Sequence, residues 1–163
     1  MELRRRGDPR LVFLVLSLLL AAIYIIVGLQ PAEAANYEIS AQLSIPTVGL
    51  DSDVTELALN GQKLDTPDAI VGAYTRAENK TLLIGHATTV FENLSAVKLG
   101  AEVEYSGKIY HVVARELVPK TQINMNEILA KAEKDTLVIM TCAGELYSDG
   151  DASHRFMLTA VSE

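Results

Sequence analysis

The hydrophobic pattern divides the chain into one long apolar run and a following series of short, alternating segments. The run from Leu11 to Leu29 contains no charged residue. As an α-helix it would span roughly 28 Å, close to the hydrocarbon thickness of a bilayer. Four arginines precede it within residues 1–10. The pattern therefore predicts one transmembrane helix with a cytoplasmic N-terminus, so that everything after Leu29 lies outside the cytoplasm.

A cleaved signal peptide is the alternative, because Ala32-Glu33-Ala34 resembles a small-residue cleavage site. The apolar run is longer than the roughly 7–15 residues usual in such peptides, which favours an uncleaved anchor. We therefore divide the chain into a basic cytoplasmic tail (1–10), a transmembrane anchor (11–29), a linker (30–41) and a folded domain (42–163). The expected location is the cell membrane, with the domain on the outer side.

After Gln42 the chain consists of short segments rich in β-branched residues and separated by turn residues, a pattern typical of strands. Pro46 marks the first segment as an edge strand, and Asn60-Gly61 ends the second in a tight turn. The predicted strands are Leu43–Leu50, Val54–Leu59, Leu82–Ile84, Glu102–Tyr105, Lys108–Val113 with its continuation Arg115–Pro119, Thr136–Cys142 and Arg155–Val161.

Two short helices are predicted among these strands. Phe91–Val97 has room for a turn or two, and Asn126–Lys134 has Asn at its cap, Glu in its first turn and Lys in its last. So many short strands in one domain predict a mainly β fold, an antiparallel barrel or sandwich that hides its edges.

The charge balance excludes one class of partner. The net charge is −7, and after the first ten residues 19 acidic and 10 basic side chains remain. Such an acidic body argues against nucleic acid as a partner. The sequence has no phosphate-binding glycine-rich loop, no CxxC pair and no HExxH motif. We therefore expect neither a metal nor a cofactor.

Cys142 is the only cysteine and ends an apolar, β-favouring run, with Ala143-Gly144 and further turn residues after it. The thiol is therefore predicted at the point where a strand opens into a loop. A lone cysteine is usually a small buried hydrophobe. Outside the cytoplasm, however, an unpaired thiol is a liability that is seldom kept without use. His86 lies 56 residues upstream and Arg155 lies 13 downstream, separations that a thiol active site permits.

Four segments in order, SIPTVGL, IGHATTVFENL, TLVIMTCAG and HRFMLTAV, resemble the sortases, a family of cell-surface cysteine transpeptidases. The resemblance extends from about Gln42 to Glu163. It implies an eight-stranded β-barrel, with one or two short helices here. By the same resemblance, His86 corresponds to the catalytic histidine, Cys142 to the nucleophile and Arg155 to the active-site arginine.

The chain departs from the family pattern just before the cysteine. The family's TLxTC signature is replaced by Val138-Ile139-Met140-Thr141-Cys142, in which only the last two residues fit. These apolar changes bear on substrate preference more than on chemistry. The domain also lacks an obvious lid or a C-terminal membrane span, which points to a housekeeping-like or accessory type rather than a pilus-building one.

The resemblance implies a reaction in which Cys142 cleaves an LPxTG-like sorting signal in surface proteins through a thioacyl intermediate. The acyl group then passes to an amine of a cell-wall precursor or a protein lysine. His86 would protonate the departing amine, and Arg155 would hold the scissile carbonyl. Thr141 and Ala143 are expected to contact substrate, with backbone N–H groups after Cys142 completing an oxyanion hole.

The remaining polar features are assigned to the surroundings of the site. His111 is interpreted as structural or as a surface residue. His154 should face away from the site if Arg155 faces it, because neighbouring strand residues point to opposite faces. The acidic loop Glu145–Ser153 is predicted to form a wall of the groove that binds the substrate peptide.

Two other functions stay open at the level of sequence. One is a hydrolytic thiol protease of the same fold, with water as the acceptor. The other is a catalytically inert, membrane-tethered β-domain that binds a surface ligand. Thiol reactivity separates both enzymes from the binding domain, and dependence on an added amine separates transferase from protease.

Overall fold

The computed structural model describes residues 37–60, 63–148 and 151–163. The predicted cytoplasmic tail and transmembrane anchor, with most of the predicted linker, lie outside the described residues. Within the described ranges, no helix is both long and apolar enough to cross a membrane. Residues 37–163 form one compact unit, whose first strand begins at Ile39, three residues before the predicted start of the domain.

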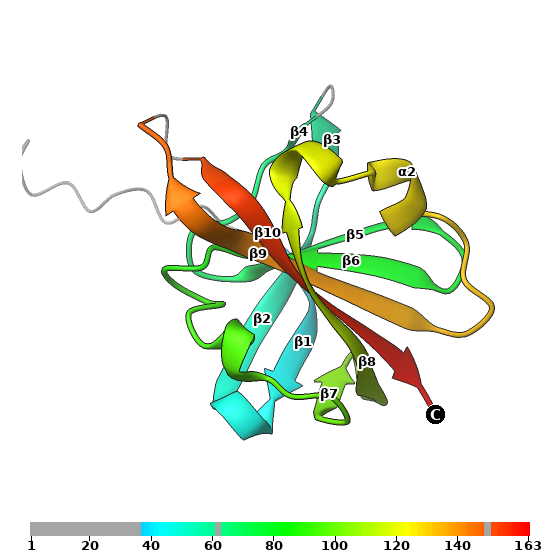
Figure 1. Cartoon of the computed structure of the whole chain (residues 1–163). Helices are drawn as coiled ribbons and strands as arrows, with labels where there is room; N and C mark the ends of the chain where they lie inside the picture. Colours follow the sequence, from blue (N-terminus) through cyan, green and yellow to red (C-terminus); the bar gives the residue numbers. More distant parts are fainter. Residues whose placement is uncertain (1–36, 61–62, 149–150) are drawn as a thin grey trace, which may run out of the picture. The chain divides into compact units, whose positions relative to one another are not determined.

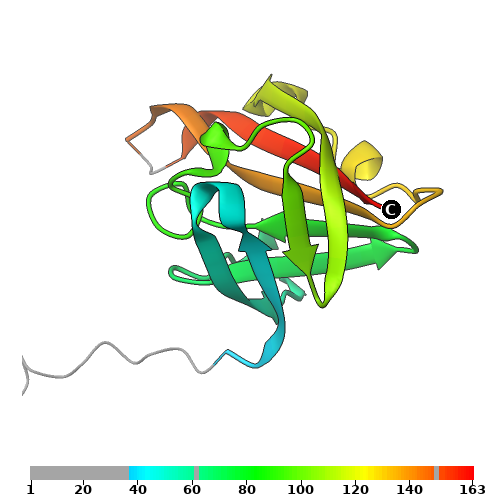
Figure 2. The same ribbon diagram turned by 90° about the horizontal axis from the view of Figure 1, so that it is seen from below.

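Eight strands close into a barrel in the order β1-β2-β5-β6-β9-β10-β8-β7, which confirms the predicted eight-stranded fold (Figures 1 and 2). A separate hairpin, β3 (Leu59–Asn60) and β4 (Lys63–Leu64), follows β2. The barrel strands are β1 (Ile39–Ile45), β2 (Leu50–Glu56), β5 (Val71–Ala77), β6 (Lys80–Ile84), β7 (Glu102–Tyr105), β8 (Lys108–Pro119), β9 (Thr136–Leu146) and β10 (Ala152–Ser162).

The sequence predicted an antiparallel barrel or sandwich, but two pairs of strands in the barrel are parallel. The pairs β2–β5 and β6–β9 are parallel, whereas the other neighbouring strands are antiparallel. A parallel pair needs a long connection, and about fifty residues separate β6 from β9. This crossover brings the end of β6, and with it His86, beside the cysteine strand.

The first predicted strand is in fact two strands. β1 ends at Ile45, a 3-10 turn covers Pro46–Val48, and β2 begins at Leu50. Gly49 adopts φ +65°, a left-handed conformation that glycine adopts without steric cost. Pro46 therefore starts a tight reversal between antiparallel strands rather than marking an edge strand. β2 also ends earlier than predicted, at Glu56, and β5 was not predicted at all.

The predicted helix Asn126–Lys134 is wrong in its start and its length. α2 is a single turn, Met125–Ile128, and its cap is Asn124, whose Oδ1 accepts the Asn126 N–H at 3.1 Å. Phe91–Val97 contains turns and a 3-10 segment, Leu94–Ala96. A third 3-10 turn covers Lys120–Gln122. An isolated turn of helix is unfavourable by itself, so packing on the barrel must stabilise α2.

β9 and β10 are longer than predicted and form a ribbon that projects past the barrel (Figure 1). Cys142 therefore lies within a strand, four residues before the end of β9, and not at the boundary of a loop. The ribbon continues because Gly144 adopts φ +80°, and the pairing register shifts between Ala152 and His154. This register shift is a β-bulge, and it lets the strand pairing continue through the polar and turn-forming residues that follow Cys142.

Alternation along β9 separates two apolar clusters. Leu137 and Ile139 point into the barrel, whose buried interior also contains Phe91, Leu94 and Leu158. Val138 lies on the opposite face with Leu82, Ile84 and Leu129, and Met140 packs against that second cluster. Cys142 has the same parity as Val138 and Met140, so it belongs to the outer face. The site is therefore built on the outside of the barrel sheet.

Candidate active site

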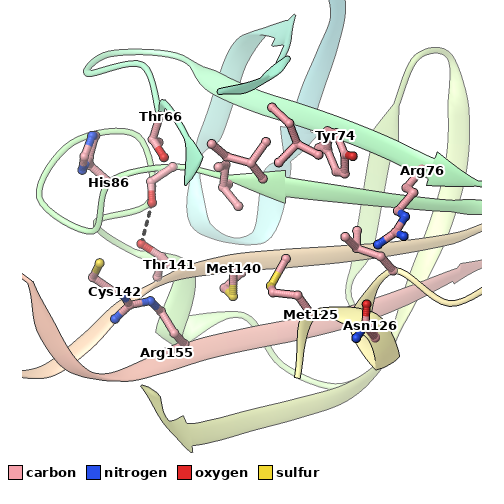
Figure 3. Close-up of a pocket in the computed structure, with 15 residues that line it drawn as sticks. Thr66, Tyr74, Arg76, His86, Met125, Asn126, Met140, Thr141, Cys142 and Arg155 are labelled. Atoms are coloured by element: carbon pink, nitrogen blue, oxygen red, sulfur yellow. Dashed lines mark hydrogen bonds between the residues drawn. The ribbon is translucent and has the colours of Figure 1, made fainter. Parts of the chain in front are cut away.

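A groove of about 750 Å³ runs along this outer face, with walls from four barrel strands, the β3–β4 hairpin and the α2 region. Its middle is apolar, and polar groups lie at both ends (Figure 3). Its lining residues are Leu59, Leu64, Thr66, Tyr74, Arg76, Ile84, Gly85, His86, Met125, Asn126, Leu129, Met140, Thr141, Cys142 and Arg155.

The strand register places Cys142 and Arg155 directly opposite each other on β9 and β10. Side chains of directly opposite residues in an antiparallel pair project from the same face of the sheet. Figure 3 accordingly shows both residues at one end of the groove. The thiol is partly exposed, so it is not the buried core hydrophobe that a lone cysteine usually is.

The Arg155 guanidinium is held in place by three acceptors. Its Nη2 donates to Asp151 Oδ1 at 2.7 Å, and its Nη1 donates to the backbone carbonyls of Ala152 and His154 at 3.0 Å each. The other carboxylate oxygen of Asp151 accepts from Lys120. Of the five N–H donors of this arginine, two have no partner among the described residues. The side chain is only 16% exposed, so this orientation is well defined.

His86 lies two residues after the end of β6, at the same end of the groove as Cys142 and Arg155 (Figure 3). Its Nε2 is 3.7 Å from Asp68 Oδ1. Among the described residues, His86 makes no hydrogen bond with the Cys142 thiol. The imidazole is 43% exposed and therefore has room to rotate from Asp68 toward the thiol.

Close packing behind His86 requires glycine at position 85. A Cβ on Gly85 would lie 2.6 Å from Val90 Cγ1 and 2.8 Å from Phe91 Cδ2. The His86 carbonyl accepts hydrogen bonds from the N–H groups of Thr89 and Phe91, and Phe91 is buried in the barrel. The turn that carries the histidine is thus anchored to the core.

The two predicted substrate-contacting residues have different surroundings. Thr141 lines the groove but is only 6% exposed, and its hydroxyl donates to the Gly85 carbonyl at 2.8 Å. It joins the cysteine strand to the turn that carries His86. Ala143 pairs with His154 in the ladder and is not among the residues that line the groove. The geometry therefore supports a contact with substrate for Thr141 better than for Ala143.

The other two histidines lie outside the groove, as the sequence predicted. His154 Nδ1 is 2.8 Å from Ser153 Oγ, and His111 Nε2 is 2.9 Å from Glu163 Oε1. The hydrogen bond to Glu163 raises the pKa of His111 above its usual range. Within the described ranges, no group of three or more His, Cys, Asp or Glu side chains is arranged to hold a metal ion.

Three residues near the site were not predicted from the sequence: Asp68, Asp151 and Arg76. Asp151 precedes Arg155 by four residues, but only the structure reveals that its carboxylate contacts the guanidinium. Asp68 and Arg76 belong to the region of β5, a strand that was not predicted. No sequence signal distinguished these three residues from ordinary surface charges.

Replacing Thr141 with valine is expected to lower the free energy of unfolding by about 1–3 kcal/mol, because it leaves the buried Gly85 carbonyl without its donor. Denaturant unfolding of the two proteins measures the difference. Thr159→Val on β10 is the control, since the Thr159 hydroxyl makes no hydrogen bond with the described residues. Equal losses in the two variants would show that the Thr141 hydrogen bond contributes little.

Comparisons with known protein families and with solved structures identify the same family. The family model described as "Sortase domain" matches residues 43–163. No curated relative matches the sequence. Several solved structures share the fold, all at identities below 25%.

Three of these structures illustrate the range of coverage. The lid mutant of sortase A from Corynebacterium diphtheriae is 22% identical with a TM-score of 0.61, over 80% of this chain and 73% of that one. A second sortase A structure from the same organism has the same identity and TM-score. That match covers 80% of this chain but only 63% of the other chain. The SrtA sortase from Actinomyces oris is 20% identical with a TM-score of 0.61, over 82% of this chain and 86% of that one.

The structural matches show a shared fold, and the family model covers most of the chain. The closed barrel agrees with the fold of these structures. The chain therefore belongs to the sortase family of transpeptidases.

Proposed function

We propose that the protein is a membrane-anchored cysteine transpeptidase that cleaves an LPxTG-like sorting signal in surface proteins. The observation that carries this proposal is the pairing of Cys142 with Arg155 at the end of a peptide-sized groove that also contains His86. A strand-borne nucleophile beside a fixed cation suits acyl transfer, because the attacking atom and the charge-stabilising group keep one geometry.

In the first half of the reaction, the Cys142 thiolate attacks the scissile carbonyl carbon. A bond forms between Sγ and that carbon, the peptide C–N bond breaks, and the imidazolium of His86 gives its proton to the departing amine. In the second half, an acceptor amine attacks the thioacyl carbon. His86 takes the proton of the incoming amine, and the C–S bond breaks to return the thiolate.

Arg155 supplies the charge that the carbonyl oxygen needs as it becomes negative. Its guanidinium is oriented by Asp151 and by two backbone carbonyls, so its remaining donors are directed before substrate arrives. Preorganised donors of this kind stabilise an oxyanion without a reorganisation cost at the moment of reaction. Asp151 is thus a positioning residue for Arg155.

The middle of the groove suits the apolar part of such a signal. Ile84, Met140 and Leu129 line the groove. Figure 3 shows Met140 and Met125 between the two polar ends. Apolar and flexible side chains, methionine in particular, accommodate a leucine or proline of a bound peptide. The acceptor is an amine of a cell-wall precursor or a protein lysine, and the predicted N-terminal helix would hold the domain outside the cytoplasm, near both substrates.

The test uses the purified full-length chain with an LPxTG-like peptide and an added amine. We expect an amine-dependent ligation product from the parent and none from Cys142→Ala. Cleavage that yields only the hydrolysed peptide at every amine concentration would favour a thiol protease. A folded chain that gives neither product, and whose thiol reacts only after denaturation, would favour an inert binding domain.

A further inference from the structure

Arg76 lies at the end of the groove away from the proposed nucleophile. It lines the same groove as Cys142, and Figure 3 shows it opposite the end that holds Cys142 and Arg155. On β5 it has the same parity as Tyr74, which also lines the groove. Asn126 of α2 lies at this end as well (Figure 3). The groove thus has a cationic side chain at each end and an apolar middle.

The two arginines of the groove differ in their partners. Arg155 is ion-paired with Asp151. Arg76 forms no ion pair or side-chain hydrogen bond with any described residue. The acidic residue two positions along the chain, Glu78, is instead bound by Lys131 at 2.6 Å. An exposed arginine without a carboxylate partner, in a domain with a large excess of acids, is a binding element available to a ligand.

The strand register fixes the level of Arg76 relative to Cys142. On β6, the level of Arg76 falls between Thr81 and Lys80, because Thr75 pairs with Thr81 and Ala77 with Lys80. The parallel pairing of β6 with β9 places Thr81 and Lys80 opposite Leu137 and Thr136. Arg76 is therefore five or six strand positions from Cys142, or about 16–20 Å at roughly 3.3 Å per residue.

An extended peptide has nearly the same rise per residue as these strands. If its scissile carbonyl lies at Cys142, the residue at the level of Arg76 is about five or six positions upstream. In an LPxTG-like signal cleaved after the threonine, four motif residues lie on the acyl side. From Cys142 the groove extends toward Arg76, and it has room for the residues on the acyl side of the cleaved bond. With the threonine at the level of Cys142, the residue that meets Arg76 is then the second or third before the motif.

We propose that Arg76 selects sorting signals that carry Asp or Glu two or three residues before the LPxTG-like motif. This inference rests on the proposed function, because the motif and its cleavage point set the position. A guanidinium fork matches a carboxylate in a bidentate geometry, which gives both attraction and orientation. A lysine at the same peptide position would instead face a like charge.

The test measures peptide binding separately from turnover. The full-length Cys142→Ala protein is titrated against fluorescent LPxTG-like peptides that differ only by Glu, Gln or Lys at the upstream position, and anisotropy gives the affinities. We expect the Glu peptide to bind about threefold to fivefold more tightly than the Gln peptide, the upper range for an exposed charge pair. High salt should reduce this ratio.

Two further substitutions in the Cys142→Ala background test the residue itself. Arg76→Gln should bring the Glu-to-Gln ratio close to one, and Arg76→Glu should favour the Lys peptide. Lys98→Gln is the matched control, because it removes one positive charge outside the groove and should leave the preference unchanged. Moving the Glu four residues further upstream should abolish the preference.

Equal affinities for the Glu and Gln peptides, including no measurable binding of either, would overturn the proposal. A preference that persists in Arg76→Gln, or that Lys98→Gln removes equally well, would also overturn it. The turnover assay with the parent protein decides the proposed function separately. A Glu preference that depends on Arg76 without amine-dependent turnover would support this site while contradicting the transpeptidase proposal.

Discussion

Replacing Arg155 with lysine is expected to lower kcat/KM for transpeptidation by about 10²–10³. Lysine keeps the positive charge but has no planar fork, so it cannot hold the Asp151 carboxylate and a substrate carbonyl in the same fixed geometry. The loss corresponds to roughly 3–4 kcal/mol of transition-state stabilisation, the usual effect of removing one oxyanion donor. The measurement is amine-dependent ligation of an LPxTG-like peptide by the full-length protein.

The control for this substitution is Arg115→Lys on β8. Arg115 lies over the Phe156 ring and donates to the Ser95 carbonyl, and it is not part of the groove. We expect its replacement to leave kcat/KM nearly unchanged. The rate of Cys142 labelling should also change little in Arg155→Lys, because Arg155 is proposed to act on substrate. Turnover near the parental rate would remove Arg155 from the active site.

Replacing His86 with alanine is expected to lower the rate of ligation by about 10²–10⁴, the usual contribution of a general acid or base. It should also slow the labelling of Cys142 by a charged thiol reagent at neutral pH. The reason is that an imidazolium beside the sulfur stabilises the thiolate, which is the reactive form. Labelling is followed on the folded full-length protein by mass spectrometry.

His111→Ala is the matched control, since His111 binds Glu163 and lies outside the groove. It should leave both ligation and labelling close to the parental values. If His86→Ala labels as fast as the parent, then His86 does not activate the thiol. If Cys142 in the parent reacts only after denaturation, the cysteine is inert and the transpeptidase proposal fails with it.

Local sequence signals were sufficient for the parts of the fold that depend on neighbours along the chain. The neighbouring strands Glu102–Tyr105 and Lys108–Val113 and the apolar strand ending near Cys142 were predicted because alternation and turn residues act within a few positions. Where the local signal was weak, prediction failed. β5 contains Gly72 and two alanines, residues that are depleted in strands. The helix α2 is a single turn, and the residues that favour a helix in the sequence continue beyond its end at Ile128.

The sequence by itself determined the family, the barrel class and the candidate residues His86, Cys142 and Arg155, because ordered motifs carry that information without coordinates. Only the tertiary structure decided how these residues meet. The parallel pairing of β6 with β9 brings His86 to the cysteine strand, and the β9–β10 register sets Arg155 opposite Cys142. The carboxylate that orients Arg155 and the Arg76 guanidinium, which has no partner among the described residues, also depend on contacts between distant strands and loops. Such contacts form only when the barrel closes, so no local pattern of hydrophobic and polar residues can specify them.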